Sequence, residues 1–360
     1  MKEHVRELCE RFFLAYSYLG VPESIEPVGN GYINDTYRVI TGGGEYLLQR
    51  INKFVFKDPE RLMDNIVRVT GHIREIAKNS GEDADRATLT VLLTDDGRAC
   101  YQSSDGEFYR VYKFINNACV RESVGSLEDM YTYAHAFGRF IDRLSGFRAE
   151  ELFETIPDFH NTKKRYEALE SSFENDIYGR AFLCAPEMEF ARSMRGLASV
   201  LSEGGLPLRV THNDTKLSNI LFDTKSKNAV AVIDLDTVMA GYSVYDFGDI
   251  IRCAAASVGE ESVEFSRVEL DLELYRAAAL GFVHGCTGLS RAEIEMMPYA
   301  AMTMTYECGI RFLCDYLCGD VYFKTQRAGH NLDRAKNQFA LLSDMEKKLG
   351  EMKSITYCLK

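Results

Sequence analysis

The stretch from residue 210 to residue 237, VTHNDTKLSNILFDTKSKNAVAVIDLDT, constrains the fold of this chain more than any other. It holds two short apolar runs, Ile220–Phe222 and Ala229–Ile233, on either side of a polar stretch, Asp223–Asn228. Two such runs joined by a short polar connection predict a β-hairpin. The strands of a hairpin run in opposite directions, so the residues just before the first strand and just after the second are expected at one end.

Polar residues stand at that end of the predicted hairpin. Asn219 directly precedes it, Asp234 directly follows it, and Asp214 lies in the preceding loop. Carboxylate and amide oxygens are ligands that Mg²⁺ prefers, and Mg²⁺ takes its remaining ligands from water and phosphate. A further carboxylate nearby can accept a proton from an attacking hydroxyl. The segment therefore has the parts that kinase-type phosphoryl transfer needs.

A plainer interpretation is a loop whose Asp and Asn side chains only cap and turn the backbone. That interpretation would suit an isolated Asn-Asp-Thr. Here the pattern H-x-D-x-x-x-x-N, an apolar hairpin and the pattern I-D-x-D follow one another in order. The combination favours the catalytic interpretation.

The two parts of the chain differ in their patterns. Before about residue 115 we expect a small antiparallel sheet, with strands at 34–40, 45–51, 87–93, 99–102 and 108–115, and helices within 1–20 and at 58–77. Later residues favour helices, the clearest early ones at 127–144 and 186–201, apart from a strand pair near 209–235. We therefore predict an α+β fold with a β-sheet N-terminal lobe over residues 1–115 and a mostly helical C-terminal lobe over residues 116–360.

Composition argues against several classes of protein. The 360 residues include 42 Lys and Arg against 54 Asp and Glu, so the net charge is −12, whereas a nucleic-acid binder needs a basic face. No apolar stretch approaches the roughly 18 residues of a transmembrane helix, and the first residues lack an apolar signal core. We expect no nucleic-acid or membrane partner, and a cytoplasmic location. The 10 Cys include no C-x-x-C pair, which favours reduced thiols.

Several stretches point to one family. They are GNGYINDTYRV from residue 29, YLLQRIN from 46, RVYKFI from 110, DFHNTKKRYE from 158, THNDTKLSNIL from 211, IDLDTVMAGYSVYDFGDIIR from 233 and TYECGIRFLCDYLCGDVYF from 305. With them the chain resembles the aminoglycoside phosphotransferase/choline kinase superfamily, and within it the bacterial N-acetylhexosamine 1-kinases. The resemblance covers nearly the whole chain and implies a bilobal protein kinase-like fold whose N-terminal lobe binds nucleotide.

The resemblance implies a role for each residue of the catalytic pattern. Asp214 would be the catalytic base, and Asn219 and Asp234 would bind Mg²⁺. His212 would be a structural member of the loop, packing and bonding backbone. Asn213 stands where the family more often has a small residue, which leaves it available to contact the substrate.

Asp246-Phe247-Gly248 spells the D-F-G metal motif of protein kinases. It stands 27 residues after Asn219, too far for the hairpin arrangement, and Asp234 is better placed. We expect Asp246 to be structural, capping the helix that follows or bonding the catalytic loop.

ATP is the expected nucleotide, and the expected contacts are Gly29, Gly31, Asn34, Thr36, Gln49 and Ile115. A glycine turn lets backbone N–H groups approach phosphates, although a plain hairpin turn is the alternative. Gln49 stands where such kinases usually carry a lysine, and it offers a weaker, neutral hydrogen bond. The backbone near Ile115 would hold the adenine.

The acceptor side is expected on the helical stretch from residue 306 to residue 323. Glu307, Arg311 and Asp315 recur every four residues and so share one face, and Tyr322 follows a Gly-Asp turn. A mixed set of this kind suits a neutral sugar with hydroxyls and an N-acetyl group. The alternative is a solvated face of ion pairs. The resemblance favours Arg311 and Tyr322 as substrate contacts.

These expectations describe an enzyme whose partners are a nucleotide and a small sugar. It would phosphorylate the anomeric hydroxyl of N-acetylglucosamine or N-acetylgalactosamine with ATP and Mg²⁺, as a monomer or a small homo-oligomer. One alternative keeps the fold and changes the acceptor to an aminoglycoside, choline, homoserine or methylthioribose. Another, which the missing strand lysine motivates, is a nucleotide-binding pseudokinase.

Overall fold

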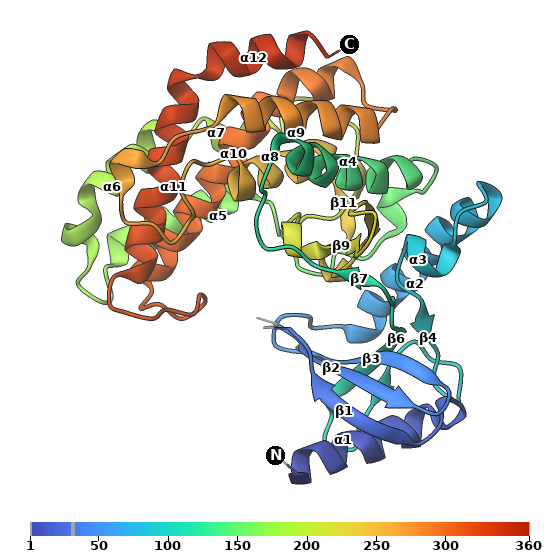
Figure 1. The fold of residues 1–360 in the computed structure, drawn as a ribbon. Coiled ribbons are helices and arrows are strands. Elements are labelled where there is room, and N and C mark those ends of the chain that lie inside the picture. Colours follow the sequence, from blue (N-terminus) through green and yellow to red (C-terminus); the bar gives the residue numbers. More distant parts are fainter. Residues whose placement is uncertain (1, 30–32, 360) are drawn as a thin grey trace. The chain divides into compact units, whose positions relative to one another are not determined.

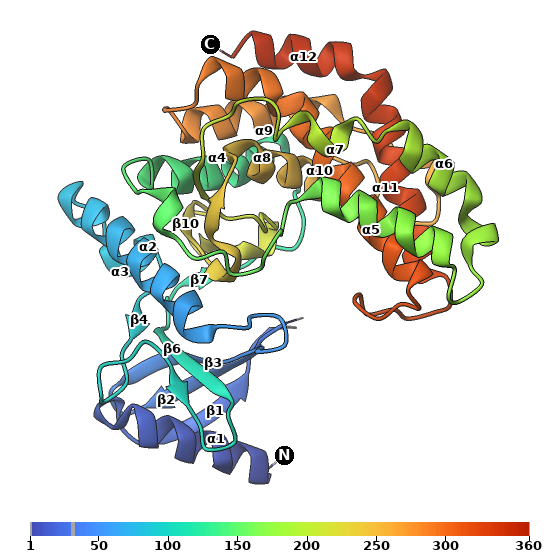
Figure 2. The same cartoon turned by 180° about the vertical axis from the view of Figure 1, so that it is seen from behind.

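The computed structural model of the chain describes residues 2–29 and 33–359, in two compact units (Figures 1 and 2). Unit 1 comprises the residues up to Cys119, Gly146–Pro157 and Leu221–Met239. Unit 2 comprises Val120–Ser145, Asp158–Ile220 and the residues from Ala240 onward.

Unit 1 is built around an antiparallel sheet with the strand order β1-β2-β3-β6-β4, and β5 also pairs with β6 (Figure 1). These strands are β1 (Pro22–Pro27), β2 (Asp35–Thr41), β3 (Gly44–Ile51), β4 (Val91–Leu92), β5 (Tyr101–Gln102) and β6 (Phe108–Lys113). The predicted hairpin with a glycine turn is the β2–β3 pair. A second small sheet has the order β10-β9-β7, with β7 (Ala118–Cys119), β9 (Ile220–Asp223) and β10 (Ala229–Val232). It confirms the hairpin expected in the 210–237 segment.

The two faces of the larger sheet have different coverings. On one face, alternate residues such as Val39, Leu48 and Val111 pack with Phe12 and Tyr16, which lie on or just after helix α1 (Lys2–Ala15). The opposite face carries polar side chains and meets helix α2 (Pro59–Asn79). Asp58 caps α2 by accepting a hydrogen bond from the Arg61 N–H, and Pro59 occupies its first position, as expected. The helix α3 (Ala84–Ala87) follows.

Unit 2 is mostly helical, with helix α10 packed among α5, α8 and α11. Its helices are α4 (Leu127–Arg143), α5 (Thr162–Asn175), α6 (Ala185–Ser193), α7 (Leu197–Val200), α8 (Ser243–Ala254), α9 (Leu272–Gly285), α10 (Arg291–Leu317), α11 (His330–Lys347) and α12 (Leu349–Tyr357). A two-stranded pair joins β8 (Arg209–Thr211) and β11 (Met239–Gly241). The short 3₁₀ helices η1 (Ser17–Leu19), η2 (Ala149–Glu151) and η5 (Leu235–Thr237) belong to unit 1, and η3 (Ala181–Cys184), η4 (Leu217–Asn219) and η6 (Phe265–Arg267) belong to unit 2.

The strand-rich unit 1 and the helical unit 2 confirm the predicted α+β fold class. The division after residue 115 stays a prediction. Two expected elements are wrong in detail. The strand expected at 87–93 shrinks to Val91–Leu92, because Asp83 caps the short helix α3. The helix expected at 186–201 breaks into α6 and α7 around Gly196, a poor helix former.

Two further sequence expectations concern cysteine and membranes. All ten cysteines are free thiols in the structure, as expected. Among the described residues, no helix combines the length and the apolar character that a bilayer crossing requires.

Helices α4 and α9 approach so closely that glycine is needed at their contact. A Cβ on Gly281 would lie 2.3 Å from the Tyr131 carbonyl oxygen, and one on Gly285 would lie 2.4 Å from the His135 carbonyl oxygen. On the facing helix, a Cβ on Gly138 would meet the Phe282 carbonyl at 2.4 Å. Real Cβ atoms do not come this close to backbone oxygens, so any larger residue must push the helices apart.

We therefore expect Gly281→Ala to lower the free energy of unfolding by about 1–3 kcal/mol, as overpacked core substitutions do. Gly350→Ala, in the exposed first turn of α12, is the matched control, because its added Cβ would meet nothing within 4 Å. Urea unfolding of both variants measures the difference. Equal stability of the two variants would contradict the close packing of α4 on α9.

Candidate active site

The loop that carries the catalytic pattern follows strand β8 in unit 2. His212 is fully buried, with its ring edge-on to Phe137 and Phe140 at centroid distances of 5.2 and 5.8 Å. Its Nδ1 accepts a hydrogen bond from the Asp214 N–H at 3.3 Å. His212 is thus a packed, structural member of the loop, as predicted.

Asp246 holds this loop from the first turn of α8. Its carboxylate accepts the backbone N–H of His212 at 2.8 Å and that of Asn213 at 2.7 Å. Nearby, Asp249 accepts the Thr215 N–H at 3.0 Å. Burial raises the pKa of Asp246 to about 6, against the opposing effects of His212 and the two N–H bonds. Asp246 is therefore structural and bonds the catalytic loop, as predicted, and its D-F-G context is coincidental.

Asp214 and Asn219 lie together. The Asn219 amide Nδ2 donates to the Asp214 carbonyl at 2.8 Å and to its carboxylate at 3.2 Å. The Lys216 ammonium lies 3.0 Å from the same carboxylate, whose side chain remains 24% exposed. Burial lowers the pKa of Lys216, but the Asp214 carboxylate outweighs burial and the pKa is raised. A charged lysine thus accompanies the candidate base, a feature that the sequence analysis missed.

Asn213 has left-handed backbone, with φ of 66°. Its side chain is buried, accepts a hydrogen bond from the Thr211 hydroxyl at 2.9 Å and donates to the Thr211 carbonyl at 3.3 Å. Both of these hydrogen bonds join the Asn213 side chain to Thr211, two residues earlier in the chain. The expected substrate contact of Asn213 stays a prediction.

Asp234 belongs to unit 1, whereas Asp214 and Asn219 belong to unit 2. Asp234 follows β10 with left-handed backbone, φ 59°, and is exposed. Two residues later, Asp236 is buried and forms a bidentate ion pair with Arg110, at 2.5 and 3.0 Å. The two acids of the I-D-x-D pattern thus have opposite environments.

The expected nucleotide contacts of unit 1 fall into three groups. Gly29 has a positive φ of 72°, which suits a glycine turn, and Gly31 lies outside the described residues. Asn34 donates to the Asp236 carboxylate at 2.6 Å. The other three expected contacts are Thr36 and Gln49, whose side chains bond each other at 3.0 Å, and Ile115, which is buried two residues after β6.

On the expected acceptor side, in unit 2, Glu307 is buried. Its carboxylate contacts His160 Nδ1 at 2.9 Å and accepts the Thr162 hydroxyl at 2.6 Å. His160 Nε2 lies 3.2 Å from the Asn213 carbonyl, which joins Glu307 to the catalytic loop. Burial lowers the pKa of His160, but Glu307 outweighs burial and the pKa is raised. The sequence analysis missed the role of His160, although it lies within the DFHNTKKRYE stretch.

Arg311 and Tyr322 lie close together, and their roles as substrate contacts stay predictions. The Arg311 guanidinium lies 5.7 Å from the Tyr322 ring centroid and 5.4 Å from that of Phe323. Asp315 is buried and accepts the backbone N–H groups of residues 321–323, so it holds the loop that presents Tyr322. Because Glu307 and Asp315 are both buried and bonded internally, this helix face is not the solvated row of ion pairs that was the alternative.

Two of the described side chains, one in each unit, offer the kind of oxygen donor that Mg²⁺ prefers. The Asp234 carboxylate is exposed, and the Asn219 Nδ2 is directed at Asp214, which leaves the Asn219 Oδ1 for a cation. Both are hard oxygen donors. Within residues 2–29 and 33–359, no three His, Cys, Asp or Glu side chains gather as a protein-only metal site. An ion that takes amide, phosphate and water oxygens needs no such cluster.

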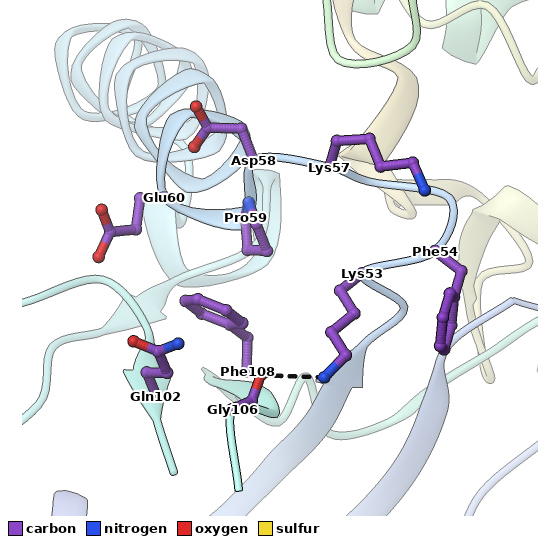
Figure 3. Close-up of a pocket in the computed structure, with 9 residues that line it drawn as sticks. All are labelled: Lys53, Phe54, Lys57, Asp58, Pro59, Glu60, Gln102, Gly106 and Phe108. Carbon is purple, nitrogen blue, oxygen red and sulfur yellow. Dashed lines mark hydrogen bonds between the residues drawn. The ribbon is translucent and has the colours of Figure 1, made fainter. Parts of the chain in front are cut away.

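A cavity of about 550 Å³ lies elsewhere in unit 1 (Figure 3). It is lined by Lys53, Phe54, Lys57, Asp58, Pro59, Glu60, Gln102, Gly106 and Phe108. The Lys53 ammonium points toward the Gly106 carbonyl and donates to it at 3.3 Å. None of the predicted site residues lines this cavity, so it is distinct from the candidate active site.

The amino-acid sequence of the chain matches a known protein family. A model of the phosphotransferase enzyme family matches residues 24–280, more than half of the chain. The chain belongs to this family. The predicted membership of the aminoglycoside phosphotransferase/choline kinase superfamily is thereby confirmed, and the coarse function is that of a phosphotransferase.

Solved structures of phosphotransferases share the fold. A microcompartment-associated aminopropanol kinase has a TM-score of 0.64 at 17% identity, with 97% of this chain and 98% of that chain covered. An aminoglycoside phosphotransferase from Alicyclobacillus acidocaldarius has a TM-score of 0.64 at 14% identity, covering 99% and 96%. Spectinomycin phosphotransferase, solved with ADP and spectinomycin, has a TM-score of 0.58 at 12% identity, covering 99% and 98%. At such identities the likeness shows the fold alone.

The raised pKa of Asp246 predicts a pH dependence of stability. Because its native pKa of about 6 exceeds the ordinary value of 3.8, this group contributes stability that is full below about pH 4 and is lost as the pH rises through 6. Asp246→Asn removes that dependence. The stability of the native protein relative to the variant should therefore fall by about 2 kcal/mol between pH 4 and pH 7. Urea unfolding at several pH values checks this, and a constant difference would contradict it.

Proposed function

We propose that this phosphotransferase uses ATP and Mg²⁺ to phosphorylate the anomeric hydroxyl of N-acetylglucosamine or N-acetylgalactosamine. The observation that carries the acceptor assignment is that the acids around Glu307 are buried, whereas a guanidinium and a phenol beside them are accessible. The acids of this helix face, Glu307 and Asp315, are buried and bonded internally, whereas the guanidinium of Arg311 and the 64% exposed phenol of Tyr322 remain for a ligand. A guanidinium and a phenol suit hydroxyl and amide oxygens better than they suit a polycation.

Asp214 is the proposed catalytic base. It accepts the proton of the anomeric hydroxyl as that oxygen attacks the terminal phosphorus of ATP in line. Support comes from its partly exposed carboxylate on a loop that is otherwise buried and bonded. Lys216, beside it, is placed to stabilise negative charge on the transferred group.

Asn219 and Asp234 are the proposed Mg²⁺ ligands. Support comes from their oxygen donors and from the β9–β10 hairpin, which Asn219 directly precedes and Asp234 follows. When bound, the ion neutralises phosphate charge and acts as a Lewis acid.

For the nucleotide, we propose that backbone N–H groups at Gly29 and Gly31 bind phosphates. Asn34, Thr36 and Gln49 would contribute polar contacts, and the backbone near Ile115 would bind adenine. Spectinomycin phosphotransferase, which shares the fold, was solved with ADP. The proposed role of Asn213 is an acceptor contact beside Asp214.

Turnover with a panel of acceptors tests the proposal. Mg·ATP is supplied with N-acetylglucosamine, N-acetylgalactosamine, glucose, galactose, choline, homoserine, methylthioribose, aminopropanol or kanamycin, and ³¹P NMR locates the phosphate in any product. We expect a phosphate coupled to H1 of an N-acetylhexosamine. Activity on a cationic acceptor alone would overturn the sugar assignment and keep the family chemistry. Nucleotide binding without any turnover would favour the pseudokinase.

Asp214→Asn should lower kcat by about 10³-fold or more and change KM little, because the base acts in the transition state. Asp333→Asn is the matched control, since Asp333 is 26% exposed and pairs with Arg327 much as Asp214 pairs with Lys216. Steady-state kinetics of both variants decides the role. A kcat near that of the native protein in Asp214→Asn would show that Asp214 is not the base.

Arg311→Met should raise the KM for the sugar at least about tenfold and leave the KM for ATP unchanged, because a lost charged hydrogen bond weakens binding by about 1.5–3 kcal/mol. Arg291→Met on the same helix is the control, since Arg291 pairs with Glu295 and lies over the Tyr357 ring. If both variants keep the sugar KM of the native protein, Arg311 does not contact the acceptor.

A further inference from the structure

The cation missing from strand β3 is present on the neighbouring strand. Gln49 on β3 pairs in register with Arg110 on the antiparallel strand β6. Directly paired residues present their side chains on the same face of a sheet. The Arg110 Nε accordingly donates to the Gln49 side-chain Oε1 at 3.0 Å, and the Gln49 Nε2 donates to the Thr36 hydroxyl.

The acid that pairs with this cation comes from the segment after β10. Arg110 is 1% exposed and Asp236 2%, and the guanidinium forms two hydrogen bonds to the carboxylate. Helix α2 supplies a different contact, Met63, whose sulfur lies 3.7 Å from Arg110 Nη1. The acidic residues of α2, which are Glu60, Asp64 and Glu75, are all exposed. The ion pair therefore joins the sheet to η5 and not to the helix.

Asp236 also binds Asn34. The Asn34 Nδ2 donates to its carboxylate at 2.6 Å, and the Asn34 side-chain Oδ1 accepts the backbone N–H of Asn52 at 2.9 Å. Burial lowers the pKa of Arg110, but the Asp236 carboxylate outweighs burial and the pKa is raised, with a smaller contribution from Asp234 two residues earlier. One buried acid thus connects three chain segments: strand β6, Asn34 just before β2, and the segment that carries the exposed Asp234.

We propose that the Arg110–Asp236 pair takes the place of the usual strand-lysine and helix-glutamate pair of kinase-type sites. Arg110 acts as a positioning residue. Through Asp236 it holds the backbone that presents Asp234, and through the same carboxylate it holds the side chain of Asn34. A buried ion pair adds little net stability compared with an apolar pair of similar size, so stability alone does not account for it. The inference rests on the proposed roles of Asp234 and Asn34 in binding Mg·nucleotide.

Replacing both members of the pair by apolar residues separates the effect of the pair on the position of Asp234 from its effect on the stability of the protein. Arg110→Met and Asp236→Leu each leave one buried charge unpaired, and both should be strongly destabilised. The double variant leaves none and should recover stability. Calorimetry then gives the Kd of ADP with and without Mg²⁺. The Kd measured without Mg²⁺, divided by the Kd measured with it, gives the contribution of the metal to nucleotide binding. We expect the double variant to be as stable as the native protein but to show a ratio at least about tenfold smaller.

Arg50→Met is the control on the same sheet. Arg50 forms an exposed ion pair with Asp35 and neighbours Gln49, and its replacement should leave the ratio unchanged. A stable double variant with the ratio of the native protein would overturn the inference. If the double variant does not fold, Arg110→Lys keeps the charge but loses the two-pronged geometry, and its ratio should fall about threefold or more. An unchanged ratio in that variant overturns the inference as well.

These binding measurements need no acceptor. If the native protein binds Mg·ADP but phosphorylates no sugar, the acceptor assignment fails and the inference about Arg110 is still tested. If the native protein shows no Mg²⁺-dependent ADP binding, the proposed function itself fails.

Discussion

A single buried carboxylate, that of Asp246, determines the shape of the catalytic loop. It accepts the N–H groups of two consecutive residues, His212 and Asn213, and so fixes two neighbouring peptide planes. Asn213 takes left-handed backbone, and its carbonyl meets His160, which Glu307 holds in turn. The position of the candidate base and the link to the acceptor region therefore both depend on one acid that is itself removed from solvent. Burial disfavours the charged form of Asp246, whereas the two N–H hydrogen bonds that hold the loop favour it.

The same arrangement recurs elsewhere in the molecule. Buried acids hold segments of the chain in place, and exposed groups are accessible to ligands. In the I-D-x-D pattern, Asp236 is paired with Arg110 inside unit 1, and Asp234 is exposed. In unit 2, Asp315 collects the N–H groups of the loop that presents Tyr322, while Arg311 stays accessible beside that ring. Burial, rather than residue type, separates supporting acids from candidate catalytic ones.

The elements that the sequence predicted correctly depend on residues that are close together in the chain. The β2–β3 hairpin follows from its glycine turn, helix α2 from the Asp58 cap and Pro59, and the β9–β10 hairpin from two apolar runs. The prediction of a strand at 87–93 was wrong because Asp83 caps the short helix α3, which extends to Ala87. The Arg110–Asp236 pair joins residues 126 positions apart, so no local pattern could show that the missing strand lysine has a substitute one strand away. Lys216 and His160 lay inside recognised stretches, but only their contacts reveal their partners.

The most direct test of the account is a crystal structure of the protein with Mg²⁺, a non-hydrolysable ATP analogue and N-acetylglucosamine. The account predicts the anomeric oxygen within hydrogen-bond distance of the Asp214 carboxylate, with the metal bound by Asn219 and Asp234 and the sugar in contact with Arg311. A different hydroxyl at Asp214, or a metal held by other side chains, would contradict the central claim that these residues carry out transfer to the anomeric position.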